Sequence, residues 1–236
     1  MRAFSAFTFD IRFQWRHGFY AVYMVVCAAY WLLVQFIPEP LREQAAVLLT
    51  FSDPSALGLL MAGGILLLER DQGIHGPLFA SPLRIGEYLL AKAASLALLS
   101  LAAAWAIHLP AAGMPDAPLS FSLGVILTST FMTLLSIGVG ARHRTVNAFL
   151  LMSQLYALPF VLPLLRFFGI WDSPIMLLLP TEGTLTLLQS AYILPPPLKL
   201  LHAFAVLLLW NAAVYAWART SYERYVLERE KARERQ

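Results

Sequence analysis

The chain alternates long apolar stretches with short polar ones. Six apolar stretches reach the roughly 20 residues that a helix needs to cross about 30 Å of hydrocarbon. Hydrocarbon offers no water to the backbone, and the alternating pattern of barrel strands is absent, so each stretch predicts a helix. The fold class is therefore all-α and polytopic, with a membrane domain over 19–218. The expected spans are 19–37, 47–68, 89–109, 119–141, 146–168 and 198–218.

Residues 1–18 have a different pattern and are too polar to span. Phe4, Phe7, Ile11 and Trp15 recur at helical spacing between charged residues. We expect an amphipathic helix in the membrane interface with its basic residues toward anionic head groups, and a frayed end is the alternative.

The segments around the last span carry further expectations. Residues 169–197 are apolar but interrupted by Pro180, Gly183 and three consecutive prolines, which favours short re-entrant or interfacial helices on the outer face. Residues 219–236 mix acidic and basic side chains and predict a solvated, charged helical tail.

Pro159 and Pro163 lie in the outer half of the fifth span and should kink this span or end it early.

The composition supports a membrane protein. Hydrophobic residues make up 59% of the 236 residues, charged residues 13%, and mean hydropathy is +0.65. A soluble domain carries about 25% charged residues. The single cysteine, Cys27, excludes a disulfide framework within the chain, and the N-terminal stretch lacks the continuous apolar core of a cleavable signal.

Lysine and arginine fall mainly on one side of the predicted spans. With the N-terminus inside, 14 of the 17 lie in the inner segments and only Arg42, Arg166 and Lys199 lie outside. This asymmetry predicts a multi-pass protein of the inner (plasma) membrane with both termini cytoplasmic. It also accounts for the net charge of +3, so no nucleic-acid partner is implied.

The sequence carries no recognisable catalytic motif. None of its glycines leads into the Lys-Ser or Lys-Thr of a phosphate-binding loop, and no Gly-x-Ser-x-Gly elbow is present. The five histidines lie in separate segments and form no metal-ligand motif. We therefore expect a non-enzymatic chain without a catalytic residue, bound cofactor or metal of its own.

Asp53 is the one ionisable residue well inside a predicted span, where a charge costs about 2.5–3.5 kcal/mol. It precedes Pro54, so either it or Ser52 could cap a helix that begins there. A transport-pathway role for Asp53 is the alternative.

A polar insert, LLLERDQGIHGPLFASPLRIGEYLLAK over 66–92, separates the second and third spans. We expect Glu69-Arg70-Asp71 to end the second span at the cytoplasmic surface, and Gly73 to permit a turn. Residues 69–88 would then form a short amphipathic element between two helix ends. Such an element is well placed to dock on a soluble partner and pass its motion into both spans.

This insert resembles the cytoplasmic coupling segment of ABC-2 type exporter permeases, and residues 53–92 are similar to the fluoroquinolone-exporter subgroup. Residues 74–77 depart from the family pattern. The matching positions are Glu69, Arg70, Asp71, Gly73, Leu78, Ser81, Pro82, Leu83, Glu87 and Lys92.

The resemblance implies that this chain forms the membrane path for a hydrophobic or amphipathic small molecule, including drugs. A separate ATPase subunit would use the ATP and receive the coupling segment. Two permease chains, as a homodimer or heterodimer, would complete one pathway, with spans two and five near the dimer axis. The implied pathway residues are Asp53, Ser55, Met61, Ser153, Gln154 and Tyr156.

Other classes remain open from the residues alone. An ion-coupled secondary transporter would need buried ionisable groups, for which Asp53 is the candidate. A non-transporting membrane scaffold would use the insert only for docking. A membrane enzyme lacks a catalytic constellation, and the sequence does not identify the substrate.

Overall fold

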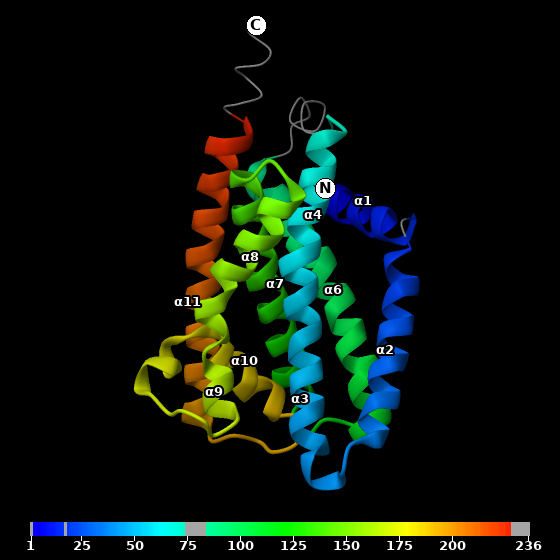
Figure 1. The fold of residues 1–236 in the computed structure, drawn as a ribbon, viewed down its shortest axis with the longest axis vertical. Helices are drawn as coiled ribbons and strands as arrows, with labels where there is room; N and C mark the ends of the chain where they lie inside the picture. The colour runs from blue at the N-terminus through cyan, green and yellow to red at the C-terminus, as the bar shows by residue number, and fades with distance from the viewer. Residues whose placement is uncertain (1, 17, 74–83, 228–236) are drawn as a thin grey trace, which may run out of the picture.

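The computed structural model of the chain describes residues 2–16, 18–73 and 84–227, and Figure 1 shows a helical bundle. These ranges contain helices and no strand. The first half comprises α1 (Arg2–Arg16), α2 (Phe19–Phe36), α3 (Glu39–Ala56), the π-helical turn η1 (Leu57–Met61), α4 (Ala62–Asp71) and α6 (Ile85–Ala112). The second half comprises α7 (Pro118–Arg142), α8 (Val146–Val161), α9 (Pro163–Phe167), η2 (Pro174–Leu178), α10 (Pro180–Gln189), α11 (Pro197–Tyr222) and η3 (Glu223–Leu227).

Five helices in these ranges are long and apolar enough to cross a membrane. They confirm an all-α, multi-pass membrane protein, but the predicted count of six spans is not confirmed. The predicted fifth span is split into α8 and α9, which meet at Leu162 between Pro159 and Pro163. The two prolines explain the break, since each removes a backbone donor. The five long helices cover Phe19–Phe36, Glu39–Asp71, Ile85–Ala112, Pro118–Arg142 and Pro197–Val226.

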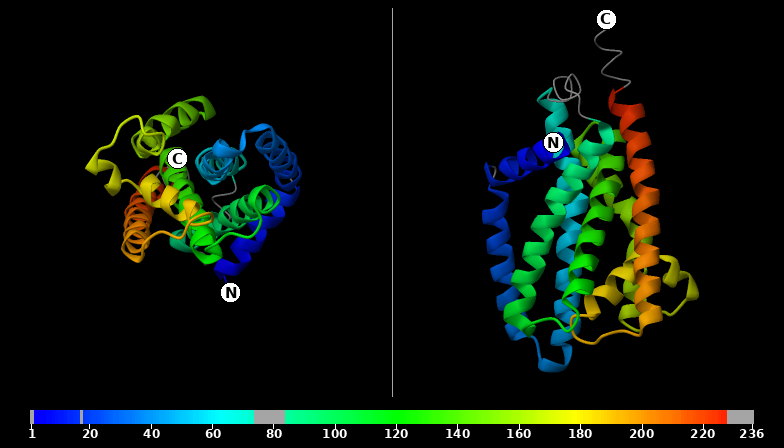
Figure 2. Two further views of the ribbon diagram at one scale, coloured as in Figure 1. Left: turned by 90° about the horizontal axis from the view of Figure 1, so that it is seen from below. Right: turned by 180° about the vertical axis from the view of Figure 1, so that it is seen from behind.

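Helix α7 is the most buried of the long helices and forms the centre of the bundle. Helices α4, α6, α8 and α11 pack around it, and α10 closes one end. Helix α2 stands at the edge against α6, and its large apolar side chains, such as Met24, Val25 and Phe36, are exposed (Figure 2). Exposed apolar faces of this kind fit a surface that lipid covers.

The two ends of the bundle differ, and we name them after the helices found there. At the α1 end, α1 lies across the bundle against α6, and the ends of α4 and α11 lie at the same end of the molecule (Figures 1 and 2). At the α10 end, η2 and α10 form the short helices expected for 169–197, and nearly every residue of α10 is buried. Helix α1 covers Arg2–Arg16 of the segment 1–18, and its place in the membrane interface stays a prediction.

The second long helix contains an irregular turn that a side chain stabilises. Ser136 of α7 accepts a hydrogen bond from the Gly63 N–H at 2.8 Å and donates one to the Leu59 carbonyl at 2.6 Å. In a regular α-helix Gly63 and Leu59 would bond each other directly. The Ser136 hydroxyl has therefore entered the hydrogen-bond ladder at η1, which is a recognised cause of local widening.

This interface also requires a residue without a side chain at position 63. A Cβ on Gly63 would come within 2.2 Å of the Phe149 ring and 2.8 Å of the Ser136 hydroxyl. The close approach lets α4, α7 and α8 meet at one point.

Candidate functional site

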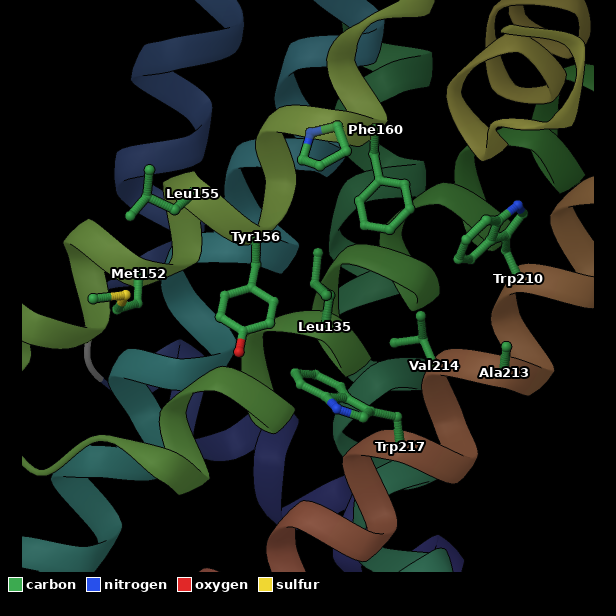
Figure 3. A pocket seen from close by; sticks show the side chains of 10 residues that line it. Leu135, Met152, Leu155, Tyr156, Phe160, Trp210, Ala213, Val214 and Trp217 are labelled. Carbon is green, nitrogen blue, oxygen red and sulfur yellow. The ribbon is translucent and has the colours of Figure 1, made fainter. Parts of the chain in front are cut away.

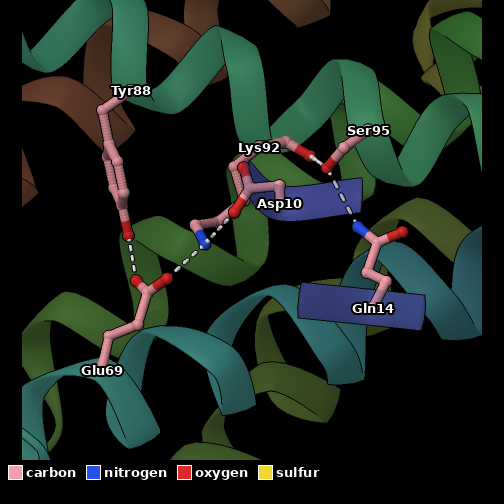
Figure 4. Close-up of polar contacts among 6 residues, drawn as sticks. All are labelled: Asp10, Gln14, Glu69, Tyr88, Lys92 and Ser95. Atoms are coloured by element: carbon pink, nitrogen blue, oxygen red, sulfur yellow. Dashed lines mark hydrogen bonds and ion pairs between the residues drawn. The ribbon is translucent and has the colours of Figure 1, made fainter. Parts of the chain in front are cut away.

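A buried group of charged side chains joins three helices at the α1 end (Figure 4). Lys92 of α6 is 1% exposed, and its Nζ lies 2.8 Å from Glu69 Oε1 and 3.3 Å from Asp10 Oδ1. Tyr88 donates a hydrogen bond from its hydroxyl to the other oxygen of Glu69. We call Asp10, Glu69, Tyr88 and Lys92 the charge cluster.

Each helix contributes to the charge cluster through its local geometry. Tyr88 and Lys92 are four residues apart on α6 and therefore lie on one face of that helix. Glu69 stands in the last turn of α4, and Asp10 comes from α1. One turn along α1, Gln14 donates a hydrogen bond at 3.0 Å to Ser95 of α6, which fixes α1 against α6 at a second point.

The cluster brings two carboxyl groups to one ammonium. Burial raises the pKa of the Asp10 carboxyl, the Lys92 ammonium opposes this, and the Glu69 carboxylate adds to it. The net effect is a raised pKa for Asp10. Removing one member of a buried ion pair typically costs about 3–5 kcal/mol, because the remaining charge loses its partner. The cluster therefore holds α1, α4 and α6 together as a unit.

The predicted coupling residues separate into buried and exposed positions. The expectation that Glu69, Arg70 and Asp71 share the surface is wrong for Glu69, which is 4% exposed and belongs to the charge cluster. Arg70 donates to the His143 carbonyl at 3.2 Å, whereas Asp71 is exposed. Gly73 is also exposed, with a φ of +67° that favours glycine. Leu78, Ser81, Pro82 and Leu83 lie outside the described residues.

The predicted helix end at residues 69–71 is confirmed, since α4 ends at Asp71. The next described helix, α6, begins at Ile85, where Glu87 accepts a hydrogen bond from the Arg84 N–H at 2.9 Å. The two helix ends on either side of the predicted coupling segment, Glu69 in α4 and Tyr88 and Lys92 in α6, are thus bonded to each other.

Asp53 lies inside α3, which runs unbroken from Glu39 to Ala56, so the cap interpretation is wrong for both Ser52 and Asp53. Asp53 is 3% exposed, and Tyr23 of α2 hydrogen-bonds to its carboxyl group. Its Oδ2 atom has no hydrogen-bond partner in the described part of the chain. A buried carboxyl group within a span is a functional candidate.

The other implied pathway residues do not form one cluster. Ser55 and Met61 are partly buried on α3 and η1. On α8, Ser153 is buried and donates to the Leu150 carbonyl of its own helix, whereas Gln154 is exposed. Tyr156 lines a pocket (Figure 3).

That pocket, which we call the aromatic pocket, lies between α8 and α11 over α7 and has a volume of about 670 Å³. Binding sites for small molecules typically fall between about 300 and 1,000 Å³ and are lined mainly by apolar and aromatic groups. Its aromatic residues contact one another, with ring centroids 5.1 Å apart for Phe160 and Trp210 and 5.7 Å apart for Tyr156 and Trp217. The lining residues are Leu135, Met152, Leu155, Tyr156, Pro159, Phe160, Trp210, Ala213, Val214 and Trp217.

Sequence reasoning missed Asp10 and the tryptophans of this pocket. Trp210 and Trp217 are seven residues apart, two turns of one helix face, so their common face could have been read from the sequence. Asp10 interrupts the apolar face of α1, which indicates a buried partner. Within the described ranges, no three His, Cys, Asp or Glu side chains are placed to hold a metal ion.

The long apolar helices and the exposed apolar faces define a multi-pass membrane protein, and the aromatic pocket has the size and lining of a small-molecule site. The chain belongs to the fluoroquinolones export permease protein family, which it matches over residues 1–230. It is 27% identical over 203 residues to the fluoroquinolones export permease protein of Mycobacterium tuberculosis, in each of two strains. The alignments cover 84% of this chain and 86% of each relative. Membership of this family identifies the chain as an export permease.

Proposed function

We propose that this chain is the membrane-spanning subunit of an ATP-driven ABC-2 type exporter that removes hydrophobic or amphipathic drugs from the cytoplasm. A separate ATPase subunit would bind and hydrolyse ATP. A second permease chain, identical or related, would complete the pathway. The names of the M. tuberculosis relatives support a fluoroquinolone as the first substrate to test.

The charge cluster carries this proposal. It bonds the two helix ends that flank the predicted coupling segment and attaches α1 to them. A force applied to that segment by an ATPase would therefore reach α4 and α6 together. In this arrangement the α1 end faces the cytoplasm of a cell with an inner (plasma) membrane, and both termini are cytoplasmic.

The test combines co-purification with transport. The full chain, isolated from its native membranes in mild detergent, should bring an ATPase subunit with it. Inverted membrane vesicles should then accumulate a fluoroquinolone on addition of ATP but not of a non-hydrolysable analogue. Asp71→Lys should lower substrate-stimulated ATP hydrolysis about tenfold or more at an unchanged membrane level. The same charge reversal at exposed Asp116, at the α10 end, should leave hydrolysis unchanged.

One observation favours a second candidate, an ion-coupled transporter. Asp53 is buried within a span and has Tyr23 as its hydrogen-bond partner. Under this alternative, an uncoupler would abolish export in the presence of ATP, and Asp53→Asn would have the same effect. Export that persists with the uncoupler and stops without ATP hydrolysis would exclude it.

A further inference from the structure

The aromatic pocket opens at the side of the bundle. Helices α8 and α11, which form its walls, both lie at the edge of the molecule (Figure 2), and Leu158 and Leu209 on these helices are exposed. Trp210 and Trp217 mark its two ends on α11, about 10 Å apart along the helix axis. A planar molecule dissolved in the bilayer could therefore reach the pocket sideways, within one chain.

The unused polar groups of the pocket gather at one end (Figure 3). The Trp210 indole N–H donates to the Leu178 carbonyl at 2.7 Å and is already paired. Within the described residues, the Trp217 indole N–H and the Tyr156 hydroxyl have no hydrogen-bond partner. The indole can only donate, and the hydroxyl can donate as well. A ligand oxygen that accepts hydrogen bonds fits this end.

A positive charge lies beyond the same end. The guanidinium of Arg142 is 4.7 Å from the centre of the Trp217 ring and 3.2 Å from the Ser221 hydroxyl. Arg142 is partly buried, and no carboxylate of the described residues forms an ion pair with it. A cation that no described carboxylate pairs, next to two donors that no described residue pairs, is complementary to an anion.

We propose that the aromatic pocket binds a planar aromatic carboxylate that reaches it from the inner half of the bilayer. The rings of the ligand lie against Phe160, Trp210 and Tyr156, and its carboxylate points to Trp217 and Arg142. This inference deepens the proposed export function and rests on it. It places a substrate site inside one chain, and Tyr156, one of the implied pathway residues, belongs to its lining.

The test compares two ligands and two arginines. The full chain in lipid nanodiscs is titrated with a fluoroquinolone, a planar aromatic carboxylic acid, and with its decarboxylated analogue, and binding is followed by ligand fluorescence. Arg142→Gln should weaken binding of the acid about tenfold and leave the analogue unaffected. Arg144→Gln changes an exposed arginine two residues away and should alter neither affinity.

A second variant tests the pocket without touching the charge. Ala213 lines the pocket and is exposed, so Ala213→Phe should fill part of it and weaken binding of both ligands with no loss of thermal stability. Equal affinities of wild type and Arg142→Gln for the acid would overturn the proposal. The proposal would also be overturned if Ala213→Phe changed only the oligomeric state of the chain, because the pocket would then be occupied by a second protein chain. Complete displacement of the acid by an uncharged lipid chain would overturn it as well, because the pocket would then be a lipid site.

The two proposals fail in different ways. Acid-selective binding without ATP-dependent uptake into vesicles would refute the exporter and keep the pocket. ATP-dependent uptake that Arg142→Gln and Ala213→Phe leave unchanged would refute the pocket and keep the exporter.

Discussion

At the scale of single residues, the arrangement at the α1 end depends on one lysine. Lys92 is the only cation of the charge cluster and is shared by two carboxyl groups from different helices. Its side chain is almost fully enclosed, at 1% exposure. A buried charge of this kind contributes to stability only while its partners are present.

Lys92→Met should therefore destabilise the chain by about 3–5 kcal/mol, because two buried carboxyl groups lose their shared cation. The loss would appear as a lower midpoint of thermal unfolding, followed by intrinsic fluorescence in detergent. Methionine keeps much of the volume of the lysine stem, so lost packing contributes little.

Asp10→Asn provides the comparison. It removes the excess negative charge but keeps the shape of the side chain, so we expect a smaller loss of about 1–2 kcal/mol. Since the pKa of Asp10 is raised in the folded state, ionisation of Asp10 lowers stability as pH rises from about 3.8 through the raised value. Asp10→Asn should remove this part of the pH dependence. Equal losses for the two variants at all pH values would contradict our description of the cluster.

At the scale of elements, α11 and α7 are in contact where the Trp217 ring packs on Gly138. A Cβ on Gly138 would lie 2.1 Å from the Trp217 ring, so the indole rests directly on the α7 backbone. The same ring forms one end of the aromatic pocket and lies under Arg142. The shape of the pocket therefore depends on this contact.

Gly138→Ala should displace Trp217 and cost about 1–3 kcal/mol through overpacking. Gly64→Ala is the matched change, because a Cβ there meets nothing within 4 Å, and it should be neutral or slightly stabilising. Thermal unfolding of both variants in the same detergent measures the difference. A similar midpoint for the two would show that the contact is not tight.

The sequence predicted the helices better than their contacts. Helix α2 begins at Phe19, as the apolar pattern indicates, but the next helix begins at Glu39, eight residues before the apolar stretch at Val47. Hydropathy identifies the part of a helix that lies in lipid. Polar residues such as Arg42 and Glu43 can extend the same helix beyond the lipid, so the apolar pattern does not show where the helix begins. The contact between Asp10 and Lys92 joins positions 82 residues apart, and nothing in the local sequence of either residue specifies the other.

The candidate site shows the same limit. Tyr156 was expected from the family resemblance. The pocket around it needs side chains from three helices, and their relative rotation cannot be read from the local sequence pattern of any one of them. Pro159 and Pro163 were identified correctly as a break, because a missing N–H is a local property.

At the scale of the whole molecule, the proposed orientation predicts which end of the bundle a reagent outside the cell can reach. Asp116 precedes α7 at the α10 end, and Arg144 follows α7 at the α1 end, and both are exposed. In a Cys27→Ser background, an impermeant maleimide should label an Asp116→Cys variant in intact cells. It should label an Arg144→Cys variant only after the membrane is opened. The opposite pattern would reverse the assignment of the α1 end to the cytoplasm.

The Ser136 hydroxyl in the second long helix has a mechanical consequence. A π-helical turn holds one residue more than an α-helical turn, so tightening η1 would rotate one half of the helix against the other by about 100°. Asp53 stands on one side of η1 and Glu69 on the other. Because Ser136 can bond Leu59 and Gly63 while they are apart, and these two can bond each other without it, both forms keep their backbone polar groups satisfied. A displacement of the charge cluster, which contains Glu69, would therefore rotate one half of this helix relative to the half that carries Asp53.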